Sequence, residues 1–164
     1  MAENYIIQSG DVVEGKLGSC FMKINGENIP IAWLKNVKAT MEKNKTEFAR
    51  LGVTAKAHRS SGWTGKGEAT MYYAVSLFRQ MAQQYARTGK DVYVDLVITN
   101  DDPTATVGQQ TVLLRNVNFD NIVLARLDIE GDEPLDEDIN FTFDDFEYLS
   151  VFTHPAIPAG LSFA

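Results

Sequence analysis

The sequence contains few of the residues from which disulfides, metal centres and acid–base catalytic sites are built. Its 164 residues include a single cysteine, Cys20, and two histidines, His58 and His154. One thiol cannot form an internal disulfide or a multi-cysteine metal site. No run approaches the roughly 18 consecutive apolar residues of a membrane span, and the N-terminus lacks the basic start and apolar stretch of a signal peptide. We therefore expect a cytosolic protein that has no cofactor and does not bind a membrane on its own.

Sequence motifs of common enzymes are missing as well. There is no nucleophile elbow, zinc-protease helix motif, P-loop or dinucleotide fingerprint. The glycine-rich run 62–67 resembles a phosphate-binding loop only loosely, and the acidic run 128–138 does not follow the order of a calcium-binding EF-hand loop. We therefore predict no catalytic residue, no metal site and no enzymatic activity; the alternative from this class is a small hydrolase that uses His58 and a carboxylate.

The composition is typical of a globular domain. Apolar residues make up 45% of the chain and charged residues 23%, which is close to the average for folded domains and excludes a collagen-like or disordered chain. No internal repeat, low-complexity tract or linker divides the sequence. Residues 1–164 are therefore predicted to form a single domain.

Charge is distributed unevenly along this chain, whose formal net charge is −7. Residues 35–66 contain 8 basic and 2 acidic side chains, whereas residues 91–150 contain 2 basic and 15 acidic ones. Such an asymmetry can reflect two solvated faces, or it can allow copies of the chain to meet head to tail through oppositely charged surfaces. The acidic total disfavours specific binding of DNA.

Hydrophobic periodicity predicts a mainly β protein. Residues 16–24 and a second extended run from Ile29 flank Asn25-Gly26 and predict a tight hairpin. A long strand is expected from Trp33 to about Phe48, and the charged, glycine-containing residues 50–67 are expected to form a long loop or an extended arm.

The second half of the chain is predicted to contain one helix and several strands. Apolar residues recur at helical spacing over 74–88, and Gly89 follows as the helix terminator. Strands are expected at 91–99, 111–119, 121–129 and 138–149. One helix among six or seven strands predicts an all-β or α+β domain, a barrel or sandwich with one packed helix.

Several longer stretches resemble the tail tube proteins of contractile phage tails, defective prophage particles and phage-tail-like bacteriocins of Gram-positive bacteria. The resemblance extends over roughly residues 15–152, in the same order along the chain. The stretches are LKNVKATMEKNKTEFARLG (34–52), SGWTGKGEATMYYAVSLFRQM (61–81), ARTGKDVYVDLVITNDDP (86–103), GQQTVLLRNVNFD (108–120), LARLD (124–128) and FTFDDFE (141–147). The apolar, proline-containing C-terminal tail, 150–164, is longer than expected for this family.

The resemblance implies an α+β, mainly β fold of the phage tail tube and type VI secretion tube kind, with two packed sheets in a sandwich or barrel and one flanking helix at about 74–88. It also implies hexameric rings that stack into a hollow tube inside a sheath, a conduit for DNA or, in a bacteriocin, for ions. The implied partners are other copies of the chain, the sheath, a baseplate or tail initiator and a tape-measure protein. DNA would pass without sequence-specific binding, and the particle would assemble in the cytoplasm of the bacterial host.

On this hypothesis three groups of residues have roles in assembly. An extended arm, 41–67, would contact the adjacent ring or subunit through Lys43, Lys45, Arg50, Lys56, His58, Arg59 and Trp63. The polar residues at alternate positions of two strands would face the lumen, namely Asn36, Lys38, Thr40, Glu42, Asp138, Asn140, Thr142 and Asp144. The polar side of the helix would face the sheath through Arg79, Gln83 and Arg87.

A different class of function is compatible with the same element pattern. One helix, about seven strands and several aromatic residues also describe a monomeric ligand-binding β-barrel, which would enclose an apolar pocket. The two hypotheses differ in the oligomeric state that they predict.

Overall fold

The structure is a computed structural model that describes residues 6–154, 157, 158, 160, 161 and 163. Its contacts divide the chain into two compact units. The first unit contains the N-terminal segment up to Ala32, Asp95–Leu114 and the segment from Phe146 onward, and the second contains Trp33–Val94 and Arg115–Asp145. In the described part of the chain, no helix is long and apolar enough to cross a membrane.

The first unit is built on a tight hairpin that follows a short 3-10 helix (Ser9–Asp11). β1 (Gly18–Ile24) pairs antiparallel with β2 (Glu27–Pro30) and, on its other side, with β5 (Val94–Asp101). Between β1 and β2, Asn25 and Gly26 have φ angles of 50° and 85°, which a two-residue hairpin turn of the Asn-Gly type requires. The predicted hairpin is confirmed.

β6 (Gln109–Phe119) and β8 (Asp145–Ser150) complete the strands of the first unit. The hydrogen-bonded order is β2-β1-β5-β6-β7-β4-β3, and β8 pairs with β6. β6 continues past Leu114 into the second unit. The strands thus form one continuous antiparallel series, and the predicted mainly β fold with a single helix is confirmed for the described residues.

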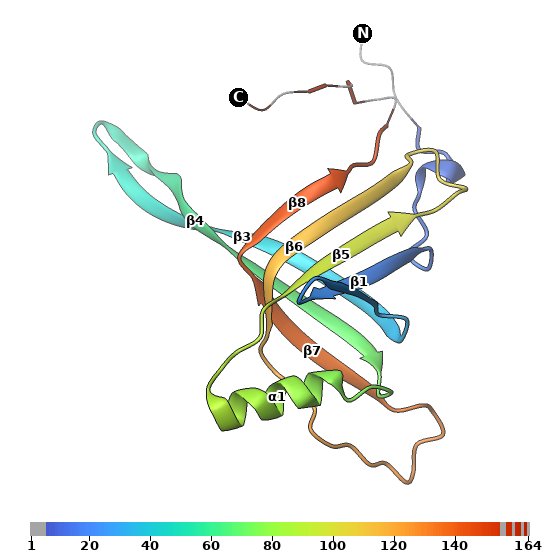
Figure 1. Ribbon diagram of the computed structural model, residues 1–164. Coiled ribbons are helices and arrows are strands. Elements are labelled where there is room, and N and C mark those ends of the chain that lie inside the picture. The colour runs from blue at the N-terminus through green and yellow to red at the C-terminus, as the bar shows by residue number, and fades with distance from the viewer. Residues whose placement is uncertain (1–5, 155–156, 159, 162, 164) are drawn as a thin grey trace. The chain divides into compact units, whose positions relative to one another are not determined.

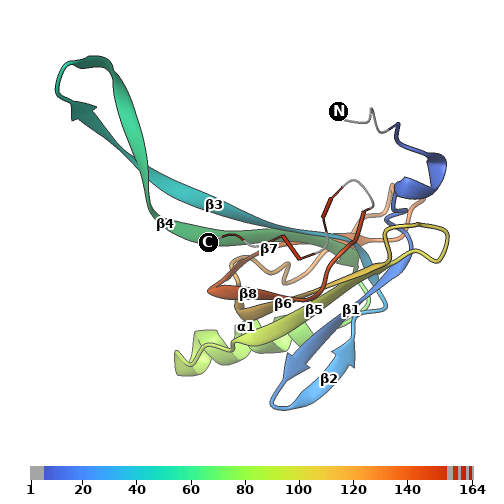
Figure 2. The same cartoon turned by 90° about the horizontal axis from the view of Figure 1, so that it is seen from above.

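The second unit contains a long hairpin that projects beyond the rest of its strands (Figures 1 and 2). β3 (Leu34–Arg50) pairs with β4 (Val53–Tyr72) from Leu34 opposite Met71 to Arg50 opposite Val53. β7 (Asp136–Phe143) pairs with β4 only from Tyr72 to Gly65. Beyond Gly65 the hairpin is therefore a two-stranded ribbon that ends at the turn Leu51-Gly52 (cyan and green in Figure 1).

One face of β4 and β7 forms the core of this unit against helix α1 (Leu77–Thr88). The Phe78 ring of α1 lies 4.9 Å from the Phe119 ring, which in turn lies 6.3 Å from the Phe141 ring of β7. Burial of each such ring stabilises the fold by roughly 1.5–3 kcal/mol. The buried apolar side chains of the unit are Ala69, Met71, Phe78, Val94, Val117, Ile139, Phe141 and Phe143.

Helix α1 confirms the predicted helix but begins at Leu77, three residues later than expected. It ends where predicted, because Gly89 adopts φ 68° and donates its N–H to the Tyr85 carbonyl. The left-handed backbone conformation at this position favours glycine.

Three predicted elements differ from the structure. Of the two alternatives predicted for residues 50–67, a long loop or an extended arm, the loop is wrong, because all but the turn at Leu51-Gly52 belong to β3 and β4. The strand expected at 121–129 is absent from the described structure, where these residues belong to no helix or strand. The strand expected at 138–149 is divided at Asp144, whose N–H donates to the Arg115 carbonyl, so that β7 ends and β8 begins there.

Candidate assembly surfaces

The first candidate surface is the arm, residues 41–67 of the β3–β4 hairpin. All seven residues predicted to contact other copies lie on it with exposed side chains. Glu47 offsets part of their charge, because Lys56 Nζ lies 3.4 Å from Glu47 Oε2 and His58 Nδ1 lies 3.9 Å from Glu47 Oε1. Such exposed pairs contribute little to stability. Because Glu47 neutralises only part of the positive charge, the ribbon remains a basic surface.

Trp63 lies at the base of the arm. Its ring is 6.2 Å from the Phe143 ring of β7, while 38% of the residue stays exposed. We infer that Trp63 fixes the direction in which the arm leaves the unit and still offers an aromatic surface to a partner.

The tip of the arm is apolar. Phe48, Leu51 and Val53 are exposed there, and Leu51 has 104% of its reference surface accessible. Sequence reasoning identified the charges of the arm but missed this tip, because residues 48–53 read as the start of a loop.

The second candidate surface is the polar face of β3, β4 and β7. Residues directly opposite one another in antiparallel strands point to the same face. The register places Asn36, Thr70 and Asp138 in one row, Lys38, Glu68 and Asn140 in the next, and Thr40, Lys66 and Thr142 in a third. The structure thus brings together on one face the two sets of residues predicted to face the lumen.

Basic and acidic groups alternate on this polar face. Lys66 Nζ lies 3.2 Å from Glu42 Oε2, and Thr70 Oγ1 donates to Asp138 Oδ1 at 2.7 Å. A groove of about 430 Å³ runs over the second and third of these rows. The β4 members were missed because no strand was expected there: residues 50–67 were predicted to be a loop or an arm, and Glu68 and Thr70 were assigned to no element. Asp144 lies just beyond the end of β7.

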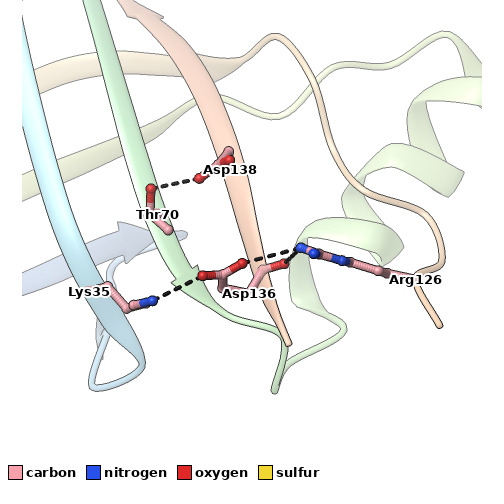
Figure 3. A network of polar contacts seen from close by, with 5 residues as sticks. All are labelled: Lys35, Thr70, Arg126, Asp136 and Asp138. Atoms are coloured by element: carbon pink, nitrogen blue, oxygen red, sulfur yellow. Dashed lines mark hydrogen bonds and ion pairs between the residues drawn. The ribbon is translucent and has the colours of Figure 1, made fainter. Parts of the chain in front are cut away.

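A network of polar contacts links β3, β4 and β7 at the end of these strands opposite the arm (Figure 3). Asp136 accepts hydrogen bonds from Lys35 Nζ at 3.0 Å and from Arg126 Nη1 at 3.2 Å. The hydrogen bond with Lys35 lowers the pKa of the Asp136 carboxyl and raises the pKa of the Lys35 ammonium. Through Arg126 the network ties the segment between β6 and β7 to the strands.

Helix α1 supplies the third candidate surface, but Arg79 does not belong to it. Its Nη1 lies 2.8 Å from Glu137 Oε2, and its guanidinium stacks on the Tyr73 ring at 4.1 Å. Glu137 occupies the core face of β7 and is almost fully buried, so its charge needs a partner inside the fold. This leaves Gln83 and Arg87 as the exposed residues of the predicted set. In the sequence, Glu137 stands in the alternating series of apolar residues Ile139, Phe141 and Phe143. A carboxylate at such a position was the signal that a cation, here Arg79, must point inward.

No group of three or more potential metal ligands occurs among the residues that the structure describes. His58 has a carboxylate neighbour in Glu47, but both side chains are more than half exposed on the two-stranded ribbon.

Comparison with known proteins identifies the family. The model of the family described as "Phage tail tube protein" matches residues 6–150. The chain belongs to the phage tail tube protein family.

A curated relative and two solved structures extend this finding. The phage-like element PBSX protein XkdM of Bacillus subtilis (strain 168) is 35% identical over 141 residues, which cover 86% of this chain and 92% of that protein. A chain in the 6-fold symmetrised cryo-EM structure of the anti-feeding prophage baseplate matches with a TM-score of 0.63 at 12% identity, covering 82% of this chain and 93% of that one. A chain in the extended PVC sheath-tube complex of an extracellular contractile injection system gives 0.61 at 13% identity, with 92% and 95% covered.

Membership of the tail tube family confirms the resemblance that the sequence motifs indicated. The protein is a structural component of a phage or phage-like tail, and it is not an enzyme. The shared fold of the two solved chains agrees with this assignment. The alternative of a monomeric ligand-binding barrel is thereby set aside.

Proposed function

We propose that this tail tube protein forms hexameric rings that stack into the hollow inner tube of a contractile tail. The observation that supports this most directly is the projecting basic arm on a chain of the tail tube family. A chain of the same fold occurs in a 6-fold symmetrised baseplate, and another occurs in a sheath-tube complex.

The strand arrangement supports ring closure. β3 is the last strand of its series and pairs with β4 alone among the strands that the structure describes. A long strand with a free edge can pair with a neighbouring chain, and closing a ring leaves no free edge. Ring closure would therefore both protect the edge of β3 and build a continuous barrel.

The polar face of β3, β4 and β7 is proposed as the lumen wall. Its lysines are interspersed with carboxylates, and Lys66 is paired with Glu42. A wall without a uniform positive field would let DNA, or ions in a bacteriocin-like particle, pass without being retained.

The remaining partners follow from the outer surface and from the tail context. Gln83 and Arg87 on α1 would contact the sheath, a baseplate or tail initiator would nucleate the tube, and a tape-measure protein would occupy its interior during assembly. Assembly would take place in the cytoplasm of the bacterial host.

Negative-stain electron microscopy of the purified protein over a concentration series tests this proposal. Hollow tubes or six-fold rings are expected, formed spontaneously or after a tail initiator complex is added. Compact monomers under every condition, including with the initiator, would contradict it.

Charge reversal separates stacking from folding. In the variant Lys43→Glu/Lys45→Glu/Lys56→Glu, the arm loses its positive charge, and we expect a folded protomer that no longer forms tubes. The matched control, Lys16→Glu/Lys23→Glu/Lys90→Glu, has the same net charge but leaves the arm unchanged, so it should still assemble. Unchanged tubes in the arm variant would show that the charges of the arm are not needed for stacking.

A further inference from the structure

The segment between β6 and β7 displays apolar side chains that the described part of the chain leaves uncovered. We call residues 124–133 the acceptor segment; it lies in the orange loop between β6 and β7 in Figure 1. Leu124, Leu127 and Ile129 are 70%, 99% and 101% exposed. Large apolar groups gathered at one exposed place indicate an interaction surface.

The acceptor segment is held in a defined conformation on both sides of Leu127. Arg126 Nη1 donates to the Asp136 backbone carbonyl at 2.6 Å, and it also reaches the Asp136 carboxylate. On the other side, Asp128 Oδ1 accepts the Glu130 N–H at 3.0 Å. Leu127 is thus presented between the Arg126 anchor on β7 and a local turn at Asp128, and this ordering lowers the entropy lost when a partner binds.

The tip of the arm and the acceptor segment are complementary in charge and share an apolar centre. The tip has Leu51 at its turn, with Arg50 next to it and Lys56 further along β4, where Lys56 is paired with Glu47. The acceptor segment surrounds its apolar residues with the carboxylates of Asp128, Glu130, Asp132 and Glu133. An apolar centre with charged flanks of opposite sign matches the anatomy of a specific protein interface.

Both surfaces belong to the second unit, but they lie at opposite ends of it (Figures 1 and 2). Lys35, which is bonded to the acceptor end through Asp136, and Arg50 at the tip both lie on β3. The 15 residue steps from Lys35 to Arg50 span about 50 Å at the rise of a strand. The tip therefore cannot reach the acceptor segment of its own chain.

We propose that the tip of one copy docks on the acceptor segment of a second copy, with Leu51 against Leu127 and Ile129 and with Arg50 and Lys56 beside the carboxylates. This inference rests on the proposed function and names the surface that receives the arm. The contact joins two different surfaces, so it is heterologous, and between copies in successive rings it can repeat without closing.

Disulfide trapping tests this contact in the full chain. The variant Leu51→Cys/Leu127→Cys has one cysteine at each surface, so oxidation of the assembled protein should yield a ladder of covalent multimers. Each single variant should give no ladder. The native Cys20 adds little background because it is buried, and burial raises its pKa to about 11, so few thiolates are present to react.

A matched control fixes the position of the contact. Leu51→Cys/Tyr85→Cys places the second cysteine on an exposed site of α1 and should give no ladder. As a second readout, Leu51→Ser removes an apolar group without touching the core, and assembly should weaken about tenfold per contact.

The outcomes separate this inference from the proposed function. Tubes without a ladder from the Leu51/Leu127 pair would overturn the docking contact and leave the tube intact. A ladder in the α1 control as strong as in the test pair would also overturn it. Absence of any assembly in the native protein would overturn the proposed function and the docking contact together.

Discussion

At the scale of single residues, Asp102 shows how a buried charge fixes the first unit. Its carboxylate is almost fully buried and accepts the backbone N–H groups of Glu14 and Thr104, each at 2.9 Å. These hydrogen bonds hold the pKa of Asp102 below its ordinary value of 3.8. Asp102 thereby connects the residues before β1 to the loop after β5.

This arrangement predicts a pH dependence of stability. Because the pKa is lower in the folded protein than in the unfolded chain, the charged form stabilises the fold above the ordinary value, and this contribution is lost as the pH falls through the folded value. Thermal unfolding between about pH 6 and pH 3 should show a shallower acid-side loss of stability in Asp102→Asn than in the native protein. The exposed neighbour Asp101 provides the control, since Asp101→Asn should keep the native slope. Equal slopes in all three proteins would refute the role of Asp102.

At the scale of elements, β4 depends on glycines that lie beneath aromatic rings. Gly65 and Gly67 are directly opposite Phe143 and Phe141 of β7. A Cβ atom on Gly67 would overlap the buried Phe141 ring. Here glycine favours a strand, because the ring of the neighbouring strand occupies the space that a side chain would need.

Gly67→Ala is therefore expected to destabilise the protein by about 1–3 kcal/mol, the usual consequence of overpacking a core. The free energy of unfolding, measured by urea denaturation, checks this. Gly15→Ala serves as the control, because nothing lies within 4 Å of the added carbon there, and its stability should be nearly native. A change as small as the control's would show that the Phe141 ring can move aside without loss of packing.

The glycines also explain which elements could be predicted from the sequence. The Asn25-Gly26 hairpin and helix α1 were predictable, because their signals are local: a turn dipeptide, a period of 3.6 residues and a terminating glycine. β4 was not, because its glycines make sense only opposite phenylalanines more than seventy positions later. The opposite error occurs in the acceptor segment: a strand was predicted at 121–129, but no strand among the described residues pairs with it.

The candidate surfaces likewise include features that the sequence could predict and features that depend on tertiary structure. The polar parities of β3 and β7 were predicted separately, and only the register of β4 between them shows that they share one face. Arg79 was misplaced because the burial of Glu137, which requires a cation, depends on tertiary packing. The apolar tip at Leu51 could be recognised only once residues 50–67 proved to be a hairpin.

At the scale of the whole molecule, the uneven charge determines how copies of the chain interact. Each copy has a net charge of −7, so distant copies repel one another. The basic residues are concentrated on the arm, and a contact between the arm and an acidic surface is attractive at short range. Ring closure through strand edges would instead depend on backbone hydrogen bonds and apolar contacts, which salt does not screen.

This difference predicts that stacking and ring formation respond differently to salt. At about 0.1 M salt the screening length is about 10 Å, and at about 1 M it is about 3 Å. Over this range we expect tubes to shorten and release rings, measured by sedimentation velocity and by tube lengths in electron micrographs. The Lys43→Glu/Lys45→Glu/Lys56→Glu variant is expected to form no tubes, so added salt should leave its rings unchanged and should relieve the repulsion between copies. Tubes whose length is independent of salt would contradict an electrostatic contribution to stacking. The apolar contact of Leu51 with Leu127 and Ile129 would then be sufficient to hold successive copies together.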